Sequence, residues 1–284
     1  MEPLAKDPDL DALAALLASR RRLLVLTGAG CSTESGIPDY RDAAGEWKHR
    51  RPMQYREFVT SPAARRRYWA RSFVGWRRIA AAEPNPAHRA LARLEEAGRV
   101  HCLVTQNVDR LHHQAGSRQL IDLHGRLDRV ECLQCRTSFR RDDFQRELER
   151  RNPATADRAT AAPAEIAPDG DADLGEVDTD GFRVPGCPRC GGVLKPAVVF
   201  FGEQVPRRRV GRAFAALREA DAMLVAGSSL MVFSGYRFAR AAAERGLPLA
   251  LVNLGRTRAD GEATLKVEGK CGEVLPRLVD RLDC

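Results

Sequence analysis

The segment Leu23-Leu24-Val25-Leu26-Thr27-Gly28-Ala29-Gly30 joins a short apolar run directly to two glycines. A buried strand that ends in glycines is typical of a nucleotide-binding unit, because glycines let backbone NH groups and a helix N-terminus approach a pyrophosphate. The third glycine of a GxGxxG motif is missing, since residue 33 is threonine. The segment therefore indicates a nucleotide-binding loop, but alone it is a weak signal for a dinucleotide.

Apolar runs and helical patterns alternate on both sides of this segment. The runs predict strands at 23–26, 100–105, 120–123, 198–201, 222–226 and 249–254. The helical patterns cover 9–20, 62–82, 86–97, 207–219, 235–245 and 272–282. Strands that alternate with helices predict an α/β fold with a Rossmann-like, doubly wound parallel sheet.

Four of the eight cysteines form two CxxC pairs, Cys132 with Cys135 and Cys187 with Cys190. Each pair places two thiolates on one side of a tight turn, and two such knuckles supply the four ligands of a closed tetrahedral zinc site. A redox-active pair would need a strand-to-helix junction, which neither pair has. We expect one structural zinc ion that takes no part in the chemistry.

The strand and helix alternation stops near residue 130 and resumes near residue 195. Residues 151–186 carry eight acidic residues against three arginines and little periodicity, which is typical of a long surface loop or of a partly ordered insertion between the zinc knuckles. We therefore predict a nucleotide-binding domain formed by 1–129 and 195–284. A small zinc-ribbon domain at 130–194, with the acidic insertion 151–186, would be inserted into it.

The composition narrows the class of protein. The chain has 284 residues, 44% of them hydrophobic, which excludes global disorder, and no apolar run is long enough to span a membrane. Only five of its 46 basic residues are lysines, and no arginine run is interleaved with aromatic residues, so we do not expect a nucleic-acid partner despite the net charge of +8. The first residues show no export or transit signal, so we expect a cytoplasmic location.

Polar residues follow the expected strands at 100–105 and 120–123. The first strand leads into Gln106-Asn107-Val108-Asp109, and the second into His124. Because parallel strands end at one edge of a sheet, these residues should converge on the Gly28 loop. The amides and Asp109 can bind a carboxamide such as nicotinamide, and His124 is a candidate general base.

The order of the motifs resembles the sirtuins, which are NAD-dependent protein deacylases, and most closely the sirtuin-four-like proteins of the class II branch. The likeness covers essentially the whole chain. It is carried by the segments 28–41, 105–109, 123–125, 199–203, 227–229, 252–253 and 271–272, together with the two CxxC pairs.

The resemblance implies a set of site residues. The catalytic residues would be His124, Asn107, Asp109 and Gln106. An extended acyl-lysine peptide would bind at Val199, Phe200, Phe201, Gly202 and Glu203. NAD would be bound by Gly28, Ala29, Gly30, Ser32, Pro38, Asp39, Tyr40, Arg41, Gln106, Asn107, Val108, Asp109, Gly227, Ser228, Ser229, Asn253, Leu254, Gly255 and Cys271.

The resemblance implies transfer of an acyl group from lysine to ADP-ribose, with release of nicotinamide. Mono-ADP-ribosyl transfer to protein is the first alternative, because it uses the same NAD cleavage with a different acceptor. A zinc-ribbon nucleic-acid binder and an oxidoreductase are further alternatives. The sequence after Arg41 lacks the Tyr-x-x-Arg arrangement of desuccinylating sirtuins, so we do not expect efficient desuccinylation. Oligomeric state is not indicated.

Overall fold

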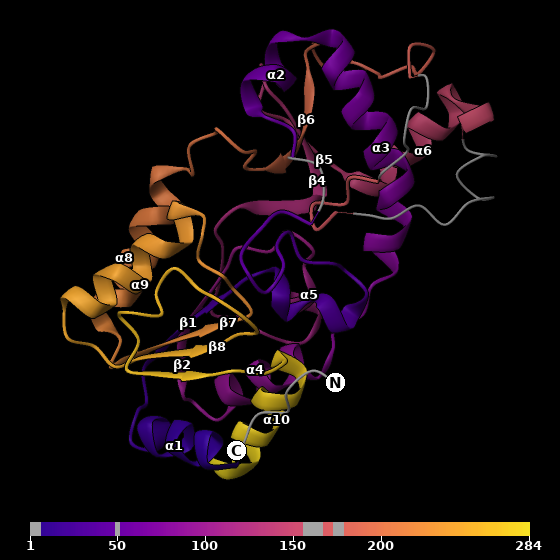
Figure 1. Ribbon diagram of the computed structural model, residues 1–284. Helices are drawn as coiled ribbons and strands as arrows, with labels where there is room; N and C mark the ends of the chain where they lie inside the picture. Colours follow the sequence, from indigo (N-terminus) through magenta and orange to yellow (C-terminus); the bar gives the residue numbers. More distant parts are fainter. Residues whose placement is uncertain (1–6, 49–51, 156–166, 173–178) are drawn as a thin grey trace.

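The larger of two sheets is parallel and has six strands (Figure 1). The computed structural model describes residues 7–48, 52–155, 167–172 and 179–284. The strand order is β3-β2-β1-β7-β8-β9. The strands are β1 (Leu23–Thr27), β2 (Val100–Thr105), β3 (Leu120–Asp122), β7 (Ala222–Ala226), β8 (Leu249–Val252) and β9 (Leu265–Val267). The order reverses between β1 and β7, and the carboxyl ends of strands at such a point form a ligand crevice.

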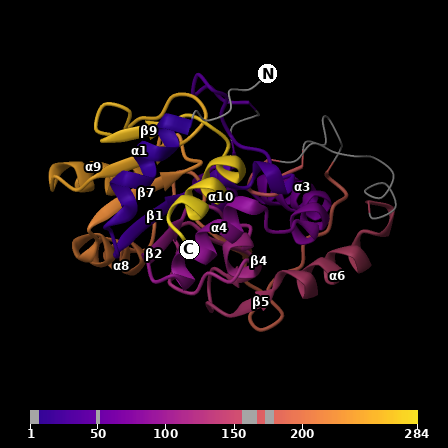
Figure 2. The same ribbon diagram turned by 90° about the horizontal axis from the view of Figure 1, so that it is seen from below.

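Helices cover both faces of this sheet. One face packs against α1 (Asp7–Ala18), α4 (Pro86–Glu96) and α10 (Cys271–Arg281), and the other against α8 (Arg207–Glu219) and α9 (Phe233–Glu244). Figure 2 shows α1, α4 and α10 gathered near the C-terminus. Leu23 and Val25 belong to the first core, and Leu24 and Leu26 to the second, as the alternation of side chains along a strand requires. The predicted doubly wound α/β fold is confirmed.

A second, antiparallel sheet carries the cysteine pairs. It has the order β5-β4-β6, formed by β4 (Gly125–Cys132), β5 (Ser138–Arg140) and β6 (Leu194–Val198). Three helices pack with it around a third core: α2 (Tyr55–Thr60), α3 (Pro62–Ala81) and α6 (Arg141–Arg151). The proposed domain limits 130 and 194 therefore fall inside β4 and at the start of β6.

Trp69 is the centre of this third core. Its ring is fully buried, and its Nε1 donates to the backbone oxygen of Leu194 at 3.2 Å. The buried guanidinium of Arg141 lies 5.5 Å from the Trp69 ring centre and 5.1 Å from that of Trp76. The helix α3 is thus fixed to the small sheet by aromatic packing and one hydrogen bond.

The predicted strand at 198–201 is wrong. Only Val198 belongs to a strand, and that strand, β6, lies in the small antiparallel sheet. Beyond it, the carboxylate of Glu203 accepts a hydrogen bond from the Phe200 NH at 2.9 Å, and Gly202 has a φ of 79°, so the chain turns. Phe201 keeps one isolated bridge, to Gln54.

Two other features of the large sheet differ from the predictions. The strand β9 was not predicted, because it has three residues with a lysine between two apolar ones. The glycine loop leads into two single-turn 3₁₀ helices, η1 (Ala29–Cys31) and η2 (Thr33–Ser35), which were not predicted either. The loop that follows can therefore extend over the crevice.

Part of the acidic insertion packs tightly against α3. Arg71 donates to the Ala172 carbonyl oxygen at 2.9 Å and lies 3.0 Å from the carboxylate of Asp171, which is buried. Residues 156–166 and 173–178 of the insertion lie outside the described residues. The insertion is thus ordered at 167–172, because these residues are held by contacts with α3.

None of the helices in the described part of the chain combines the length and apolarity that a membrane span requires.

Gly75 on α3 tests the packing of the insertion. A Cβ at this position would lie 2.1 Å from the backbone oxygen of Gly170, whereas a Cβ at Gly211 on α8 would meet nothing within 4 Å. Gly75→Ala should destabilise the protein by about 1–3 kcal/mol in urea unfolding. Gly211→Ala should be neutral or stabilising by up to about 1 kcal/mol. Equal stability of the two variants would contradict the packing of 167–172 on α3.

Candidate active site and zinc site

Two loops meet backbone to backbone at the carboxyl ends of β1 and β7. The NH of Gly30 donates to the carbonyl oxygen of Gly227 at 2.9 Å. A Cβ on Gly227, whose φ is 63°, would lie 2.2 Å from the nitrogen of Cys31, and one on Gly28 would lie 2.8 Å from the Cβ of Ser228. Only glycine permits this approach, which forms one wall of the crevice.

A cavity of about 1150 Å³ opens next to this wall. It collects residues from the sheet edge, from the loop after η2, and from the segment after β6. All of the predicted catalytic, NAD-binding and peptide-binding residues line the cavity except Pro38 and Gly255. The backbone of Gly255 instead packs against Ala43, where a Cβ would lie 2.4 Å from the carbonyl oxygen.

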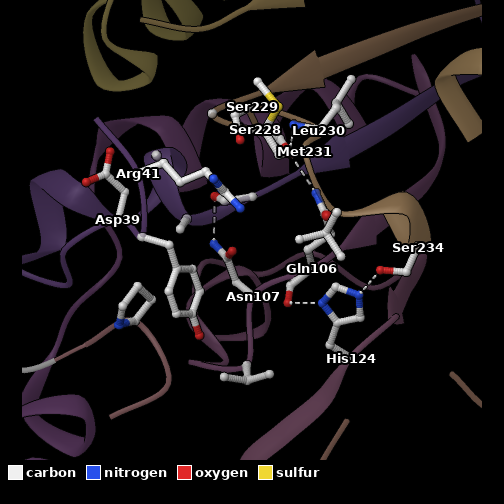
Figure 3. Close-up of a pocket in the computed structure, with 18 of the residues that line it drawn as sticks. Asp39, Arg41, Gln106, Asn107, His124, Ser228, Ser229, Leu230, Met231 and Ser234 are labelled. Atoms are coloured by element: carbon white, nitrogen blue, oxygen red, sulfur yellow. Dashed lines mark hydrogen bonds between the residues drawn. The ribbon is translucent and has the colours of Figure 1, made fainter. Parts of the chain in front are cut away.

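His124 lies at the cavity between two hydrogen-bond partners (Figure 3). Its Nδ1 is 3.0 Å from the carbonyl oxygen of Gln106, and its Nε2 is 2.7 Å from the hydroxyl of Ser234. A carbonyl oxygen can only accept, so Nδ1 carries the proton and Nε2 keeps its lone pair. Burial lowers the pKa of His124 to about 4, so the imidazole is neutral at pH 7. This arrangement suits a general base.

A hydrogen-bond network connects the residues that follow β1 and β2. The hydroxyl of Ser32 donates to Asp109 at 2.7 Å, and the amide of Asn107 donates to Ser32 at 3.0 Å and to the Gly28 carbonyl oxygen at 3.0 Å. The second oxygen of Asp109 accepts from the Leu111 NH at 2.9 Å. Because both carboxylate oxygens are engaged, the observed contacts of Asp109 are those of a residue that positions the loop.

The amide of Gln106 extends the network to the second loop. Its Nε2 donates to the hydroxyl of Ser228 at 2.8 Å. Figure 3 shows Gln106 between His124 and the Ser228 loop. The side chain of Gln106 therefore holds the loop after β7, while its backbone oxygen orients the imidazole.

The segment that contains Tyr40 and Arg41 covers one side of the cavity. Arg41 lies over the Trp47 ring at 4.1 Å and donates to the Gly45 carbonyl oxygen at 2.6 Å. The rings of Tyr40 and Phe201 lie edge to face at 5.9 Å. These contacts join the segment that contains Tyr40 and Arg41 to the segment after β6.

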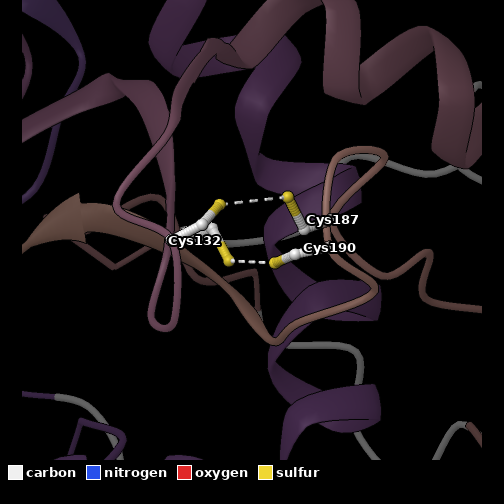
Figure 4. Close-up of side chains that lie close together, drawn as sticks. Cys132, Cys187 and Cys190 are labelled. Atoms are coloured by element: carbon white, nitrogen blue, oxygen red, sulfur yellow. Dashed lines mark hydrogen bonds between the residues drawn. The ribbon is translucent and has the colours of Figure 1, made fainter.

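The four predicted zinc ligands converge at one point (Figure 4). The sulfurs of Cys132 and Cys190 are 3.5 Å apart, those of Cys135 and Cys187 are 3.7 Å apart, and all four lie within 4.8 Å of one another. A tetrahedron with zinc–sulfur bonds of 2.3 Å has edges of about 3.8 Å. The donors therefore fit a single structural zinc ion, whose role would be to hold the two knuckles together.

The family follows from comparison with known proteins. Residues 28–234 match the Sir2 family. The chain is 59% identical over 271 residues to the NAD-dependent protein deacetylase of Bordetella bronchiseptica, covering 95% of this chain and 97% of that protein. The chain belongs to the Sir2 family.

Other members agree with this assignment. The chain is 48% identical to the NAD-dependent protein deacylase Sirt4 of Drosophila melanogaster, covering 98% of this chain and 89% of that protein. A solved structure that describes the mechanism and regulation of Sir2 enzymes aligns with a TM-score of 0.76 at 31% identity, covering 98% of this chain and 99% of that one. A Sir2 complex with a p53 peptide and NAD⁺ aligns with a TM-score of 0.74 at 30% identity, over 95% and 97% of the two chains.

Two cavity residues of this sirtuin come from the acidic insertion, and sequence reasoning did not predict them. Pro168 and Asp169 line the cavity, and burial raises the pKa of Asp169. The insertion has no periodicity that would place it, and its contact with the cavity depends on the packing against α3. Ser234, the partner of His124, was also not predicted as a site residue, because a serine at the start of a helix is common.

Cys132→Ala tests the zinc site. Because metal-binding energy is folding energy in such sites, the variant should contain one zinc ion fewer per chain than the wild type and should unfold at a clearly lower temperature. Cys102→Ala, at a buried cysteine on β2 outside the knuckles, should keep the wild-type zinc content. Elemental analysis and thermal unfolding provide both readouts, and unchanged zinc content in Cys132→Ala would contradict the assignment.

Proposed function

We propose that this sirtuin is an NAD-dependent protein lysine deacylase that transfers the acyl group of a modified lysine to ADP-ribose and releases nicotinamide. The observation that carries the proposal is a neutral His124 whose Nε2 is available as an acceptor in the cavity that the glycine loops form. The 59% identity to a protein deacetylase over nearly the whole chain supports it.

NAD is the co-substrate, and its cleavage supplies the ribose that accepts the acyl group. We assign its pyrophosphate to the loop at Gly28 and the loop at Gly227, whose close approach leaves no side chain between them. The carboxamide of nicotinamide would be bound near Asn107 and Asp109. Asn253 and Cys271, which also line the cavity, would face the adenosine.

His124 would remove a proton from a ribose hydroxyl. The hydrogen bond from Nδ1 to Gln106 fixes the tautomer, so Nε2 is the atom that receives the proton. In this structure Nε2 accepts from Ser234, so the ribose hydroxyl would take the place of the serine hydroxyl. Arg209 and Arg237 contribute, after burial, to the low pKa of His124, which favours release of the proton at the end of each turnover.

The segment 38–41 would exclude water from the bond that breaks. Tyr40 packs against Trp47 and Phe201, with ring centres 6.0 and 5.9 Å away, and these two rings also contact each other at 5.8 Å. Figure 3 shows Asp39 and Arg41, the chain neighbours of Tyr40, on the side of the cavity opposite His124. A dry site favours transfer to the acyl-lysine oxygen over hydrolysis of NAD.

The acyl-lysine peptide would bind along 199–203 as an extended strand. This segment is held on both sides: the Val199 NH donates to the His124 carbonyl oxygen at 2.7 Å, and Glu203 contacts Lys195 at 3.1 Å. The segment therefore lies next to the base. The cytoplasmic location, the lack of a nucleic-acid partner and the weak desuccinylation remain predictions from the sequence.

Product analysis tests the proposal. Incubation with NAD and a panel of acyl-lysine peptides should give one O-acyl-ADP-ribose and one nicotinamide per lysine released, measured by mass spectrometry. Nicotinamide release that depends on no peptide, with ADP-ribose on protein instead, would favour mono-ADP-ribosyl transfer. Reduction of NAD would indicate an oxidoreductase.

His124→Tyr should lower kcat by at least about 100-fold, because a positioned general base contributes roughly 10²–10⁴ to the rate. Its folding should remain intact. His101→Tyr is the matched control, since His101 lies at the start of β2 next to Glu219 and outside the cavity lining. The control should keep its activity, and a fully active His124→Tyr variant would refute the role of His124.

A further inference from the structure

A second cluster of metal-binding side chains lies next to the glycine loop at Gly28 and Gly30. Cys31 belongs to η1, His88 to α4 and His112 to α5 (Leu111–Gln114). All three are buried, with exposed fractions of 0%, 0% and 1%. The sulfur and one nitrogen of each ring lie within 4.8 Å of one another, and the ring centres are 4.7 Å apart. This spacing is short enough for one ion to contact all three groups.

Each imidazole is oriented through one of its two nitrogens. Nδ1 of His88 lies 2.9 Å from the side-chain oxygen of Asn85, the N-cap of α4. Nε2 of His112 lies 2.9 Å from the hydroxyl of Thr27 at the end of β1. Histidines that bind metals characteristically use the second nitrogen for such a hydrogen bond, which fixes the ring.

The remaining nitrogens are poorly satisfied. Nδ1 of His112 has no hydrogen-bond partner among the described residues although it is fully buried. Nε2 of His88 has only a long contact of 3.4 Å, to the hydroxyl of Ser32. A buried ring nitrogen without a hydrogen-bond partner is unusual in a folded protein. Here it lies in a cluster that also contains the thiol of Cys31.

We propose that Cys31, His88 and His112 form a second metal site, which binds zinc through the Cys31 sulfur, Nε2 of His88 and Nδ1 of His112. One sulfur and two imidazole nitrogens are donors that zinc prefers. The thiol proton would be released to solvent when the ion binds.

The site is separate from the cavity and from the four-cysteine site. None of its three residues lines the cavity, although Ser32, next to Cys31, does. An ion there would link η1, α4 and α5. Because it would bind only the folded protein, it would increase the free energy of unfolding. The proposal concerns metal binding and does not depend on the deacylase activity.

Zinc stoichiometry tests the site on the full-length protein. After incubation with excess zinc and gel filtration, the wild type should contain two zinc ions per chain by elemental analysis. Cys31→Ala should contain one, and Cys102→Ala, which removes a buried thiol outside the cluster, should contain two. One ion per chain in the wild type, or two in Cys31→Ala, would overturn the proposal.

Thermal unfolding supplies a second readout. Added zinc should raise the unfolding midpoint of the wild type and of Cys102→Ala by about 2 °C or more, whereas Cys31→Ala and His112→Gln should show no rise. If Cys31→Ala does not fold, His112→Gln takes its place in the stoichiometry measurement. A midpoint of the wild type that zinc does not change would count against the site.

Discussion

The backbone contact between the loops after β1 and β7 is the constraint on which the cavity depends. The Gly30 NH bonds to the Gly227 oxygen at 2.9 Å, and a Cβ on Gly227 would come within 2.2 Å of the Cys31 nitrogen. Without side chains between them, the two loops share one wall of the cavity. The parallel register of β1 and β7 sets this contact, since Thr27 and Ala226 end level with each other.

The catalytic side chains are positioned from this wall outward. Asn107 bonds to the Gly28 carbonyl oxygen and to Ser32, and Gln106 bonds to Ser228, so the residues after β2 are tied to both loops. The Gln106 backbone oxygen then orients His124. The imidazole is therefore fixed by the large sheet, while the loop after η2 and the segment after β6 contribute the aromatic cover.

Much of this arrangement could be predicted, because parallel strands end at one edge of the sheet. The polar residues that follow these strands must therefore meet at that edge. The glycines, Gln106 to Asp109 and His124 are found together for that reason, and the cysteine pairs because their spacing matches a metal site. The failures concern contacts between distant segments. The apolar run at 198–201 does not reveal that residues 199–201 lie outside any sheet. The composition of the acidic insertion does not reveal that Asp169 reaches the cavity. No sequence pattern shows that His112 lies beside Cys31.

The NAD affinity of Gly227→Ala, measured by calorimetric titration, tests the central role of the loop contact most directly. The added methyl group would push the Cys31 backbone away and separate the two loops, while the strands of the sheet keep their own cores. The account predicts at least about tenfold weaker NAD binding in a folded variant, a loss of about 1.4 kcal/mol or more. Wild-type affinity in a folded Gly227→Ala protein would contradict it.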